Sequence, residues 1–499
     1  MRATTSLASI LAVSNAVANA FSLVEANGIV SANCQQACTE LSTTFGPAFH
    51  YPEHDNFSIW DAKQQEVRPA CRVEPSNASD VSQILCILIH NWCHFAVKGG
   101  GHSRHAGDSN SIGGVTIDLD RIAQVEILDA NRARVGGGAN THQVYEALDA
   151  HNLSFVGGRV GTVGVGGFTL GGGTSPFSNK YGWALDNVCE YEVVLANGTI
   201  AIASEAHNPD LFFALRGGGN NFGIVTAFTV RTFAQGAVST TRTTYTSNQT
   251  EQLLDRVYEL FTDEALTNDV EMGYDLYYTY MGQTDTFVLS GTQRYGKPIA
   301  SPPVFDAINQ IPVVSRSNSV SKLSSQTQGS EPQGTTRHLF ATLTVSPSRI
   351  LLSQAIRIFE DEVQAIKSVD GLVPHLVSYA VSRNAIGAMK QRGGNALGIE
   401  DDGPLLLILV STAWSDTTGD AAVNSMTENT ISRIRHAAES LGVANRYLYI
   451  NYASAQQVSE VFAGYGEENV HRLREIQRVV DPRGVYTSRG LWRGFVKLM

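Results

Sequence analysis

The chain has 499 residues, of which 36 are Lys or Arg and 47 are Asp or Glu, so its formal net charge is −11. Hydrophobic residues make up 43% and charged residues 17%, which excludes a disordered chain and allows a sizeable core. Nucleic-acid-binding proteins usually carry a basic face, so the acidic balance argues against nucleic acid as a partner. The length predicts two large domains or about three of ordinary size.

The N-terminus has the pattern of an export signal. Arg2 supplies a positive charge, residues 7–18 are mostly small or apolar, and Ala18-Asn19-Ala20 matches a small-x-small cleavage site. We therefore expect residues 1–20 to be a signal peptide, and the protein to be secreted or held in secretory-pathway vesicles. No later stretch of about 20 uncharged apolar residues occurs, so we predict no membrane span.

Two further features agree with a secretory route. Sequons of the form N-x-S/T, which accept N-linked glycans, begin at Asn56, Asn77, Asn152, Asn197 and Asn248. The cysteines are Cys34, Cys38, Cys71, Cys86, Cys93 and Cys189. An even number of cysteines in an oxidising compartment predicts one to three disulfides of unspecified pairing, with scattered buried thiols as the alternative. Cys93-His94 near His90 does not complete a metal-binding pattern, so we predict no metal ion.

Residues 49–230 contain short β-rich runs separated by glycine-rich turns. Strands are expected over 95–98, 115–119, 132–135, 190–196, 199–203 and 224–231. Apolar residues at i, i+3 or i+4, and i+7 predict helices over 78–91 and 141–151.

Glycines are fewer between residues 236 and 445. There, β-rich stretches (270–280, 286–294, 336–346 and 405–413) alternate with amphipathic helices at 353–367 and 421–441. The last segment is expected to hold a strand at the sequence Tyr449-Ile450-Asn451, helical residues over 456–462 and 470–480, and a short tail. The pattern predicts an α+β fold in two lobes.

Three glycine clusters carry the strongest chemical signal. They cover residues 97–103, 157–173 and 216–225, and each adjoins an expected strand. Consecutive glycines leave backbone N–H groups free to surround an anion such as a pyrophosphate. One cluster is usually a surface turn, but three indicate a ligand site. No Rossmann fingerprint, P-loop, HExxH or GxSxG motif is present, which argues against kinases, zinc proteases and α/β-hydrolases.

The order of motifs resembles a known family. GGGHS…GGVTIDL is followed by VGVGG…GGG, by ALRGGGNNFGIVT, and by YxNYA with a late DPRGV. This order resembles the FAD-linked oxidases of the vanillyl-alcohol-oxidase superfamily, and most of all the secreted berberine-bridge-enzyme-like oxidases of fungi. The resemblance implies a bipartite PCMH-type FAD-binding domain over 30–235 (core 66–236), completed by 445–499. An inserted substrate domain over 236–444, with an antiparallel sheet and helices, would cover the flavin ring.

The resemblance also implies how FAD is held. His102 matches the histidine that is joined to the flavin 8α-methyl group; a histidine that merely follows a turn is the alternative. Many relatives form a second bond through a cysteine, but Val160 stands at that position, so we expect a single link and a lower flavin potential. The other implied contacts are Lys98, Gly99, Gly100, Gly101, Ser103 and Gly107 at the pyrophosphate, Gly161, Thr162 and Gly166 along the ribityl chain and ring, and the backbone of Ile224 and Val225.

Two further matches concern the reaction. Val163 matches a position that controls oxygen access in plant relatives, and valine there supports an oxidase; a packed strand residue is the alternative. Tyr449 and Asn451 match the YxN motif, whose tyrosine is the base in oligosaccharide- and monolignol-oxidising relatives. We expect Tyr449 to accept the substrate proton and Asn451 to orient the flavin or the tyrosine, with a core tyrosine as the alternative. A tyrosine with an ordinary pKa near 10 needs a nearby cation or donor, and the sequence reveals none.

Other residues near these motifs are less distinctive. Residues 406–414 match the strand that carries the basic glutamate of berberine-forming relatives, yet they contain no acid. This absence counts against the alkaloid ring-closing mechanism. Trp414 is expected to wall the pocket or the core. His105 is interpreted as a surface-loop histidine, with a position facing the flavin ring as the alternative.

The sequence therefore predicts an enzyme, an FAD-dependent oxidase. It would take a hydride from an alcohol, amine or activated C–H of a small molecule and pass the electrons to O2, releasing H2O2. An aromatic, polyketide or terpenoid metabolite is favoured over a sugar. The alternatives are an oxidative cyclase, whose pocket steers ring closure after oxidation, and a non-enzymatic flavoprotein.

Overall fold

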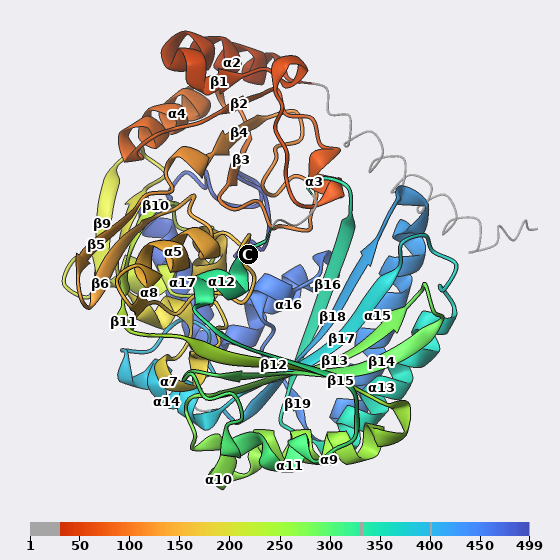
Figure 1. Cartoon of the computed structure of the whole chain (residues 1–499). Coiled ribbons are helices and arrows are strands. Elements are labelled where there is room, and N and C mark those ends of the chain that lie inside the picture. The colour runs from red at the N-terminus through yellow and green to blue at the C-terminus, as the bar shows by residue number, and fades with distance from the viewer. Residues whose placement is uncertain (1–29, 330–332, 400–401, 499) are drawn as a thin grey trace, which may run out of the picture.

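The computed structural model describes residues 30–329, 333–399 and 402–498, and its strands form sheets of four, five, two and eight strands (Figure 1). The predicted signal peptide, residues 1–20, lies outside the described residues. In the view of Figure 1 the smaller sheets lie at the top and left, and the eight-stranded sheet occupies the lower right. Among the helices described, none is long and apolar enough to cross a membrane.

The four-stranded sheet contains the strand that leads into the first glycine cluster. Its order is β1 (Phe49–His50), β2 (Cys71–Val73), β4 (Val115–Asp118) and β3 (Phe95–Lys98), and β2, β4 and β3 run parallel. Helices α2 (Ala32–Phe45) and α4 (Ala78–Asn91) share a buried core with this sheet. The Asn77 side chain caps α4, because its oxygen accepts the amide of Asp80.

Two disulfides join α2 to this unit. Cys34 is bonded to Cys93, and Cys38 to Cys71. Cys86 and Cys189 are free thiols. The number of disulfides lies within the predicted range, and Cys93 is a disulfide cysteine.

The five-stranded sheet carries the other two glycine clusters at its borders. It is antiparallel, in the order β5 (Val125–Asp129), β6 (Arg132–Gly136), β10 (Ile224–Arg231), β8 (Val188–Val194) and β9 (Ile200–Ser204). The neighbouring helices and short strands are α5 (Thr141–Asp149), β7 (Leu153–Ser154), α6 (Val165–Leu170), α7 (Ser178–Tyr181), α8 (Pro209–Leu215), β11 (Phe233–Ala234) and α17 (Glu467–Val480).

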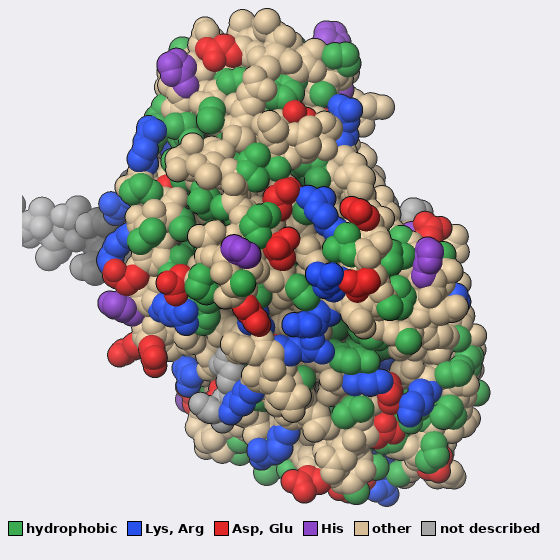
Figure 2. Space-filling model, turned by 90° about the vertical axis from the view of Figure 1, so that its left-hand side faces the viewer, with side chains coloured by type: hydrophobic (Ala, Val, Ile, Leu, Met, Phe, Trp, Pro, Cys, Tyr) green, Lys and Arg blue, Asp and Glu red, His purple; other side chains and the backbone are tan. Residues whose placement is uncertain are grey.

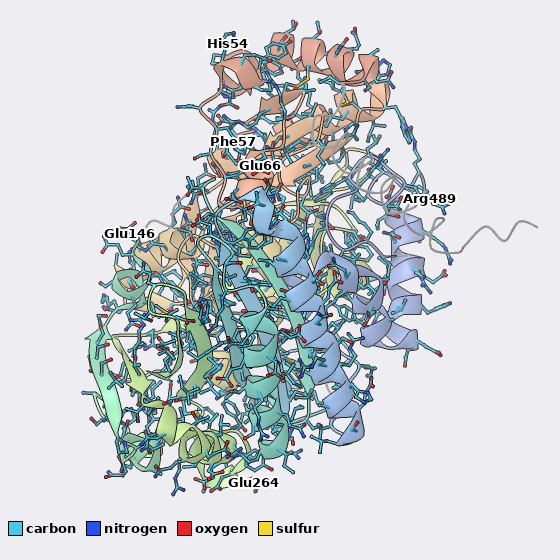
Figure 3. All side chains as sticks on the ribbon, turned by 90° about the vertical axis from the view of Figure 1, so that its right-hand side faces the viewer. His54, Phe57, Glu66, Glu146, Glu264 and Arg489 are labelled. Atoms are coloured by element: carbon cyan, nitrogen blue, oxygen red, sulfur yellow. A yellow bond between two sulfur atoms is a disulfide. The ribbon has the colours of Figure 1, made fainter. Side chains whose placement is uncertain are left out.

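The eight-stranded sheet is antiparallel throughout. Its order is β15 (Val313–Ser321), β12 (Val238–Tyr245), β14 (Thr286–Tyr295), β13 (Met272–Met281), β17 (Val373–Val381), β18 (Leu405–Trp414), β16 (Arg337–Val345) and β19 (Ala444–Asn445). Helices α13 (Arg349–Gln364) and α15 (Asp420–Ser440) lie side by side over one face (Figure 3). Helix α9 (Thr250–Thr262) packs into the same core. The other short helices are α3 (Ala62–Gln65), α10 (Glu264–Thr267), α11 (Asp306–Asn309), α12 (Leu323–Thr327), α14 (Arg383–Gln391) and α16 (Val458–Val461).

Strand β18 is buried on both faces, which explains its continuous apolar run. Leu406 and Ile408 belong to the core beneath α13 and α15, whereas Leu407 and Leu409 belong to the core shared with the glycine-rich part of the chain. The large sheet therefore has one face toward its own helices and the other toward the glycine clusters.

The prediction of a strand at Tyr449-Ile450-Asn451 is wrong. Residues Ile450–Tyr452 form a single 3-10 turn, in which the amides of Tyr452 and Ala453 bond back to the carbonyl of Tyr449 at 2.9 and 3.1 Å. These turn bonds replace the pairing that a strand would need. In this turn the side chains of Tyr449 and Tyr452 lie close together, whereas in a strand they would point to opposite faces of the sheet.

The surface mixes charges of both signs. On the face shown in Figure 2, Lys and Arg side chains alternate with Asp and Glu. All five sequon asparagines are exposed. N-glycosylation at these positions stays a prediction.

Candidate functional site

The first two glycine clusters meet backbone to backbone. A Cβ atom added to Gly100 would lie 2.3 Å from the amide nitrogen of Gly164, and one on Gly164 would lie 2.3 Å from that of Gly100. Only glycine allows this approach. Within the part of the chain that the structure describes, the amides of Gly100 and Gly101 donate to no acceptor. Two free N–H groups in a crossing of glycine loops can bind an anion.

The side chains flanking this loop already have partners. The Lys98 ammonium bonds to Asp118 Oδ1 at 3.0 Å, to Asp120 Oδ1 at 2.5 Å and to the Gly99 carbonyl at 3.4 Å, so its positive charge is already paired with carboxylates beside the loop. Ser103 Oγ donates to Asp108 Oδ2 at 2.7 Å. Gly107 turns the chain with a φ of +89°. These residues shape the loop that the sequence analysis assigned to the pyrophosphate.

His102 is placed at the end of this loop and is half-buried. Its ring stacks on Trp60 with 4.4 Å between centroids and 18° between planes. The Trp60 ring also stacks on His338, with 3.8 Å between centroids. Burial, together with the nearby charge of Arg104, lowers the pKa of His102 to about 3. The imidazole is neutral at physiological pH, so a ring nitrogen keeps the lone pair that bonding to carbon requires.

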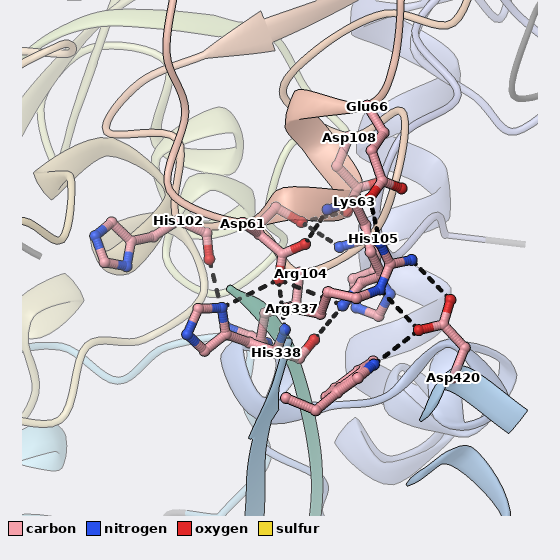
Figure 4. A network of polar contacts seen from close by, with 12 residues as sticks. Asp61, Lys63, Glu66, His102, Arg104, His105, Asp108, Arg337, His338 and Asp420 are labelled. Atoms are coloured by element: carbon pink, nitrogen blue, oxygen red, sulfur yellow. Dashed lines mark hydrogen bonds and ion pairs between the residues drawn. The ribbon is translucent and has the colours of Figure 1, made fainter. Parts of the chain in front are cut away.

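A buried carboxylate fixes the Trp60 segment to the large sheet. Asp61 accepts the backbone amides of Lys63 and His338, both at 2.8 Å, and its Oδ2 lies 3.3 Å from His338 Nδ1. Burial alone would raise the pKa of Asp61, but the hydrogen bond from His338 and the charge of Lys63 lower it below its ordinary value. The contacts of Asp61 with Lys63 and His338 are drawn in Figure 4, and they fix the residue that follows Trp60, whose ring stacks on His102.

In the second glycine cluster, predicted residues pack closely against the backbone of neighbouring segments. A Cβ on Gly161 would lie 2.1 Å from the carbonyl oxygen of Thr327, and one on Gly166 would lie 2.8 Å from that of Gly137. Thr162 and Val163 are half-buried, and the Val163 carbonyl accepts the Thr141 amide at 2.9 Å. Val160 is 41% exposed.

Ile224 and Val225 begin strand β10. Their side chains are 1% and 5% exposed and belong to the core, so only their backbone is available to a ligand. Gly137 packs on this backbone, since a Cβ there would lie 2.5 Å from the Val225 carbonyl oxygen.

Tyr449 and Asn451 lie next to each other below the second cluster. The Tyr449 hydroxyl accepts N–H groups from Gly173 (3.0 Å), Thr174 (3.3 Å) and Asn451 Nδ2 (3.0 Å). Asn451 Nδ2 also donates to the Phe168 carbonyl at 3.0 Å. Burial raises the pKa of Tyr449 to about 12, against the effect of these donors. The phenol is therefore protonated at neutral pH, with donors in place for the charge it would carry after losing its proton.

Three aromatic side chains near Tyr449, which we call the aromatic cluster, were not predicted. They are Phe340, Tyr379 and Tyr452. The Tyr452 ring lies 5.7 Å from Phe340, 6.2 Å from Tyr379 and 4.7 Å from Tyr449. Phe340 and Tyr452 are half-exposed. The only advance signal was the second tyrosine of the motif Tyr449-Ile450-Asn451-Tyr452.

Arg104 was also missed. It is 8% exposed, and its guanidinium donates to the carbonyl of Asn451 at 2.5 Å and to that of His102 at 3.4 Å. It also lies over the Phe340 ring at 4.1 Å. Arg104 is therefore a cation beside the YxN segment, which the sequence alone does not reveal.

A cavity lies between the second glycine cluster and the large sheet. Its volume is about 590 Å³, including space open to solvent, and Arg159, Thr174, Asp275, Arg294 and Tyr379 are among its lining residues. Arg159 Nε and Arg294 Nη2 approach the same carboxylate oxygen of Asp275 at 3.5 and 3.0 Å.

Two other expectations can be compared with the structure. His105 is not a surface-loop histidine, because its Nε2 is buried and its ring lies 5.5 Å from Phe495 in the C-terminal tail. Burial lowers its pKa to about 3. Trp414 is 2% exposed in the core beneath the helices, where its Nε1 donates to Asp420 at 2.8 Å.

The residues present fit FAD. The crossing of glycine loops offers free amides to a pyrophosphate, and the neutral His102 beside it can bond to carbon. The fold and this site define an FAD-linked oxidoreductase.

Residues 69–204 match the FAD binding domain family. The chain is 35% identical to the FAD-dependent monooxygenase tpcD of Cochliobolus heterostrophus, over 91% of this chain and 93% of that protein. It is 32% identical to the FAD-dependent monooxygenase FUP4 of Fusarium proliferatum, over 93% and 95%. It is 30% identical to the bifunctional solanapyrone synthase of Alternaria solani, over 84% and 80%.

Solved structures show the same fold. Glucooligosaccharide oxidase from Acremonium strictum has a TM-score of 0.74 at 20% identity, covering 93% of this chain and 99% of that chain. The 6-hydroxy-D-nicotine oxidase from Arthrobacter nicotinovorans has a TM-score of 0.71 at 21% identity, covering 88% and 96%. The chain belongs to the family of FAD-dependent oxidoreductases that these fungal relatives represent, and it has the fold of vanillyl-alcohol-oxidase-type and berberine-bridge-enzyme-like flavoproteins. The predicted α+β fold of PCMH type and the prediction of an enzyme are confirmed.

Proposed function

We propose that this protein carries FAD through a single covalent bond to His102 and oxidises a small molecule of fungal secondary metabolism. The observation that carries the proposal is the neutral His102 ring, held on Trp60 at the end of a loop whose amides are free. The relatives are named as FAD-dependent monooxygenases and as solanapyrone synthase, which favours such a substrate over a sugar. Val160 has no thiol, so it offers no second bond.

FAD bound here would accept a hydride from an alcohol, amine or activated C–H and pass the electrons to O2, giving H2O2. The backbone around Gly99–Gly101 and Gly161–Gly166 would hold the cofactor, and Val163 would leave O2 a path. Tyr449 would serve as the base in its tyrosinate form: it would first release its own proton to solvent and then accept the substrate proton, and the three N–H donors around its oxygen would stabilise the tyrosinate charge. Asn451 would orient Tyr449 through its side-chain amide.

Anaerobic mixing with candidate substrates tests this reaction. Loss of flavin absorbance near 450 nm, followed by recovery and H2O2 release when O2 is admitted, is expected. Flavin that is reduced by a substrate but is not reoxidised by O2 would contradict the oxidase assignment.

An oxidative cyclase is the second candidate. One relative is named a bifunctional solanapyrone synthase. The absence of an acid on strand β18 argues against the glutamate-dependent alkaloid mechanism, but it is compatible with ring closure that the shape of the pocket steers without a proton donor. In a cyclase the pocket would steer ring closure after oxidation. Product structure separates the two, since the oxidase gives an open product with the same carbon skeleton.

We also propose the domain limits and the location. Residues 1–20 would be a removable signal peptide. Residues 30–235 and 445–499 would form the FAD domain, and residues 236–444 would form the substrate domain. Secretion or vesicle retention is supported by exposed sequon asparagines and two disulfides. Glycosidase treatment of the protein from a fungal host should lower its mass; an unchanged mass would count against this route.

A further inference from the structure

The substrate side of the site holds more positive than negative charge. Arg159 and Arg294 share the single carboxylate of Asp275, so one guanidinium charge stays uncompensated there. Within the described residues, Arg104 forms no ion pair with a carboxylate, and its buried Nε donates to no acceptor. The Nε of Arg159 is likewise buried without a hydrogen bond.

Both arginines face the aromatic cluster. The guanidinium of Arg104 lies 4.1 Å from the ring centre of Phe340, and that of Arg159 lies 5.1 Å from that of Tyr379. Tyr452 packs against both rings. The cluster is therefore an aromatic surface with a cation at each end.

The strand register places this surface toward the glycine clusters. Phe340 on β16 pairs with Ser411 on β18, and Ser411 pairs with His375 on β17, so the three share one face of the sheet. Tyr379, also on β17, pairs with Leu407, which belongs to the core shared with the glycine-rich part. Phe340, Ser411 and His375 are half-buried rather than fully buried, so part of each remains accessible to a ligand.

Buried cations without counterions are unfavourable unless a ligand supplies negative charge. Burial lowers the pKa of Arg104 only to about 10, so the side chain stays charged at neutral pH. A planar guanidinium pairs well with a delocalised oxyanion, and its neighbouring ring suits a conjugated partner.

We propose that this site binds the delocalised oxyanion of a planar conjugated substrate, whose ring packs on the aromatic cluster while Arg104 and Arg159, at the two ends of the cluster, supply the positive charge that attracts it. The oxyanion is that of a phenol, enol or carboxylic acid. This inference rests on the proposed function, because it specifies the substrate class of the same site.

Binding of small probes to the flavin-loaded protein tests it. Benzoate is compared with neutral benzamide, and pentafluorophenolate with neutral phenol, by the change in flavin absorbance. Each anion should bind the wild type at least about tenfold more tightly than its neutral partner. Arg104→Gln and Arg159→Gln should each weaken anion binding by about 10-fold to 100-fold and change neutral-probe binding by less than about threefold. A response to benzoate alone identifies a carboxylate, and a response to pentafluorophenolate identifies a phenolate or enolate.

Arg472→Gln is the matched control, because Arg472 is an exposed arginine paired with Asp210. It should bind both probes like the wild type. Equal affinity for anionic and neutral probes in the wild type, or unchanged anion affinity in both arginine variants, overturns the inference. If one variant does not fold, as thermal unfolding would show, the other still decides. A wild type without flavin refutes the proposed function, and calorimetric titration of benzoate and benzamide into that protein then tests the inference separately.

Discussion

The hydrogen bonds to the Tyr449 hydroxyl group predict a measurable contribution of this group to the free energy of unfolding. Tyr449→Phe keeps the ring against Trp183, 5.0 Å away, but removes the acceptor of three buried N–H groups. An unsatisfied buried donor costs about 1–3 kcal/mol. The bond from Thr174 is long at 3.3 Å and such costs are not additive, so we expect a loss of about 2–4 kcal/mol in the free energy of unfolding.

Denaturant unfolding of the flavin-loaded protein measures this loss. Tyr465→Phe is the control, because the Tyr465 hydroxyl makes one bond, to the Gly217 carbonyl at 3.0 Å, and its loss should cost about 1 kcal/mol. If Tyr449 also accepts the substrate proton, its variant should lose about 100-fold or more in kcat at unchanged flavin content. A loss of stability no larger than that of the control would refute the described hydrogen-bond arrangement.

Three further predictions concern the loops and the N-terminal unit. Gly100→Ala should abolish flavin content, whereas Gly167→Ala, where a Cβ meets nothing within 4 Å, should retain it; equal flavin contents would contradict the loop crossing. The folded-state pKa of His105, about 3, lies below its ordinary value near 6.5, so the stability this residue contributes is present above pH 6.5 and is lost as pH falls. Relative to His105→Asn, the wild type should lose about 1.4 kcal/mol per pH unit below about pH 6, and parallel pH profiles would refute this. Replacing Cys34 and Cys93 by serine together should lower the free energy of unfolding by about 2–4 kcal/mol in denaturant titrations, and a change under about 1 kcal/mol would argue against the bond.

Elements with strong local patterns could be predicted from the sequence. The helix at 78–91 and the strands at 95–98 and 224–231 have the predicted bounds. Their apolar periodicity and adjoining turn residues are local signals. Strand β15 (Val313–Ser321) was missed because most of its residues are exposed and polar, so no alternation marks it. Its pairing with β12 supplies the strand's hydrogen bonds.

The residues of the candidate site also fall into two groups: those that a local motif identifies, and those whose position depends on contacts with distant parts of the chain. The glycine loops and His102 could be found because their sequence motif is local. Arg104 could not be recognised, because its burial depends on the Asn451 carbonyl, 347 residues further along the chain, and on Phe340 in the inserted sheet. The direction of Tyr449 was also unpredictable, since the turn that sets it replaces an expected strand.

Acid precipitation of the purified protein tests the central claim, that FAD is bonded to His102, most directly. We expect flavin fluorescence to stay with the precipitated wild-type protein and to be absent from precipitated His102→Ala, with thermal unfolding showing that the variant is folded. Flavin released into the supernatant by the wild type would contradict the covalent bond. A wild type that never contained flavin would contradict the whole account.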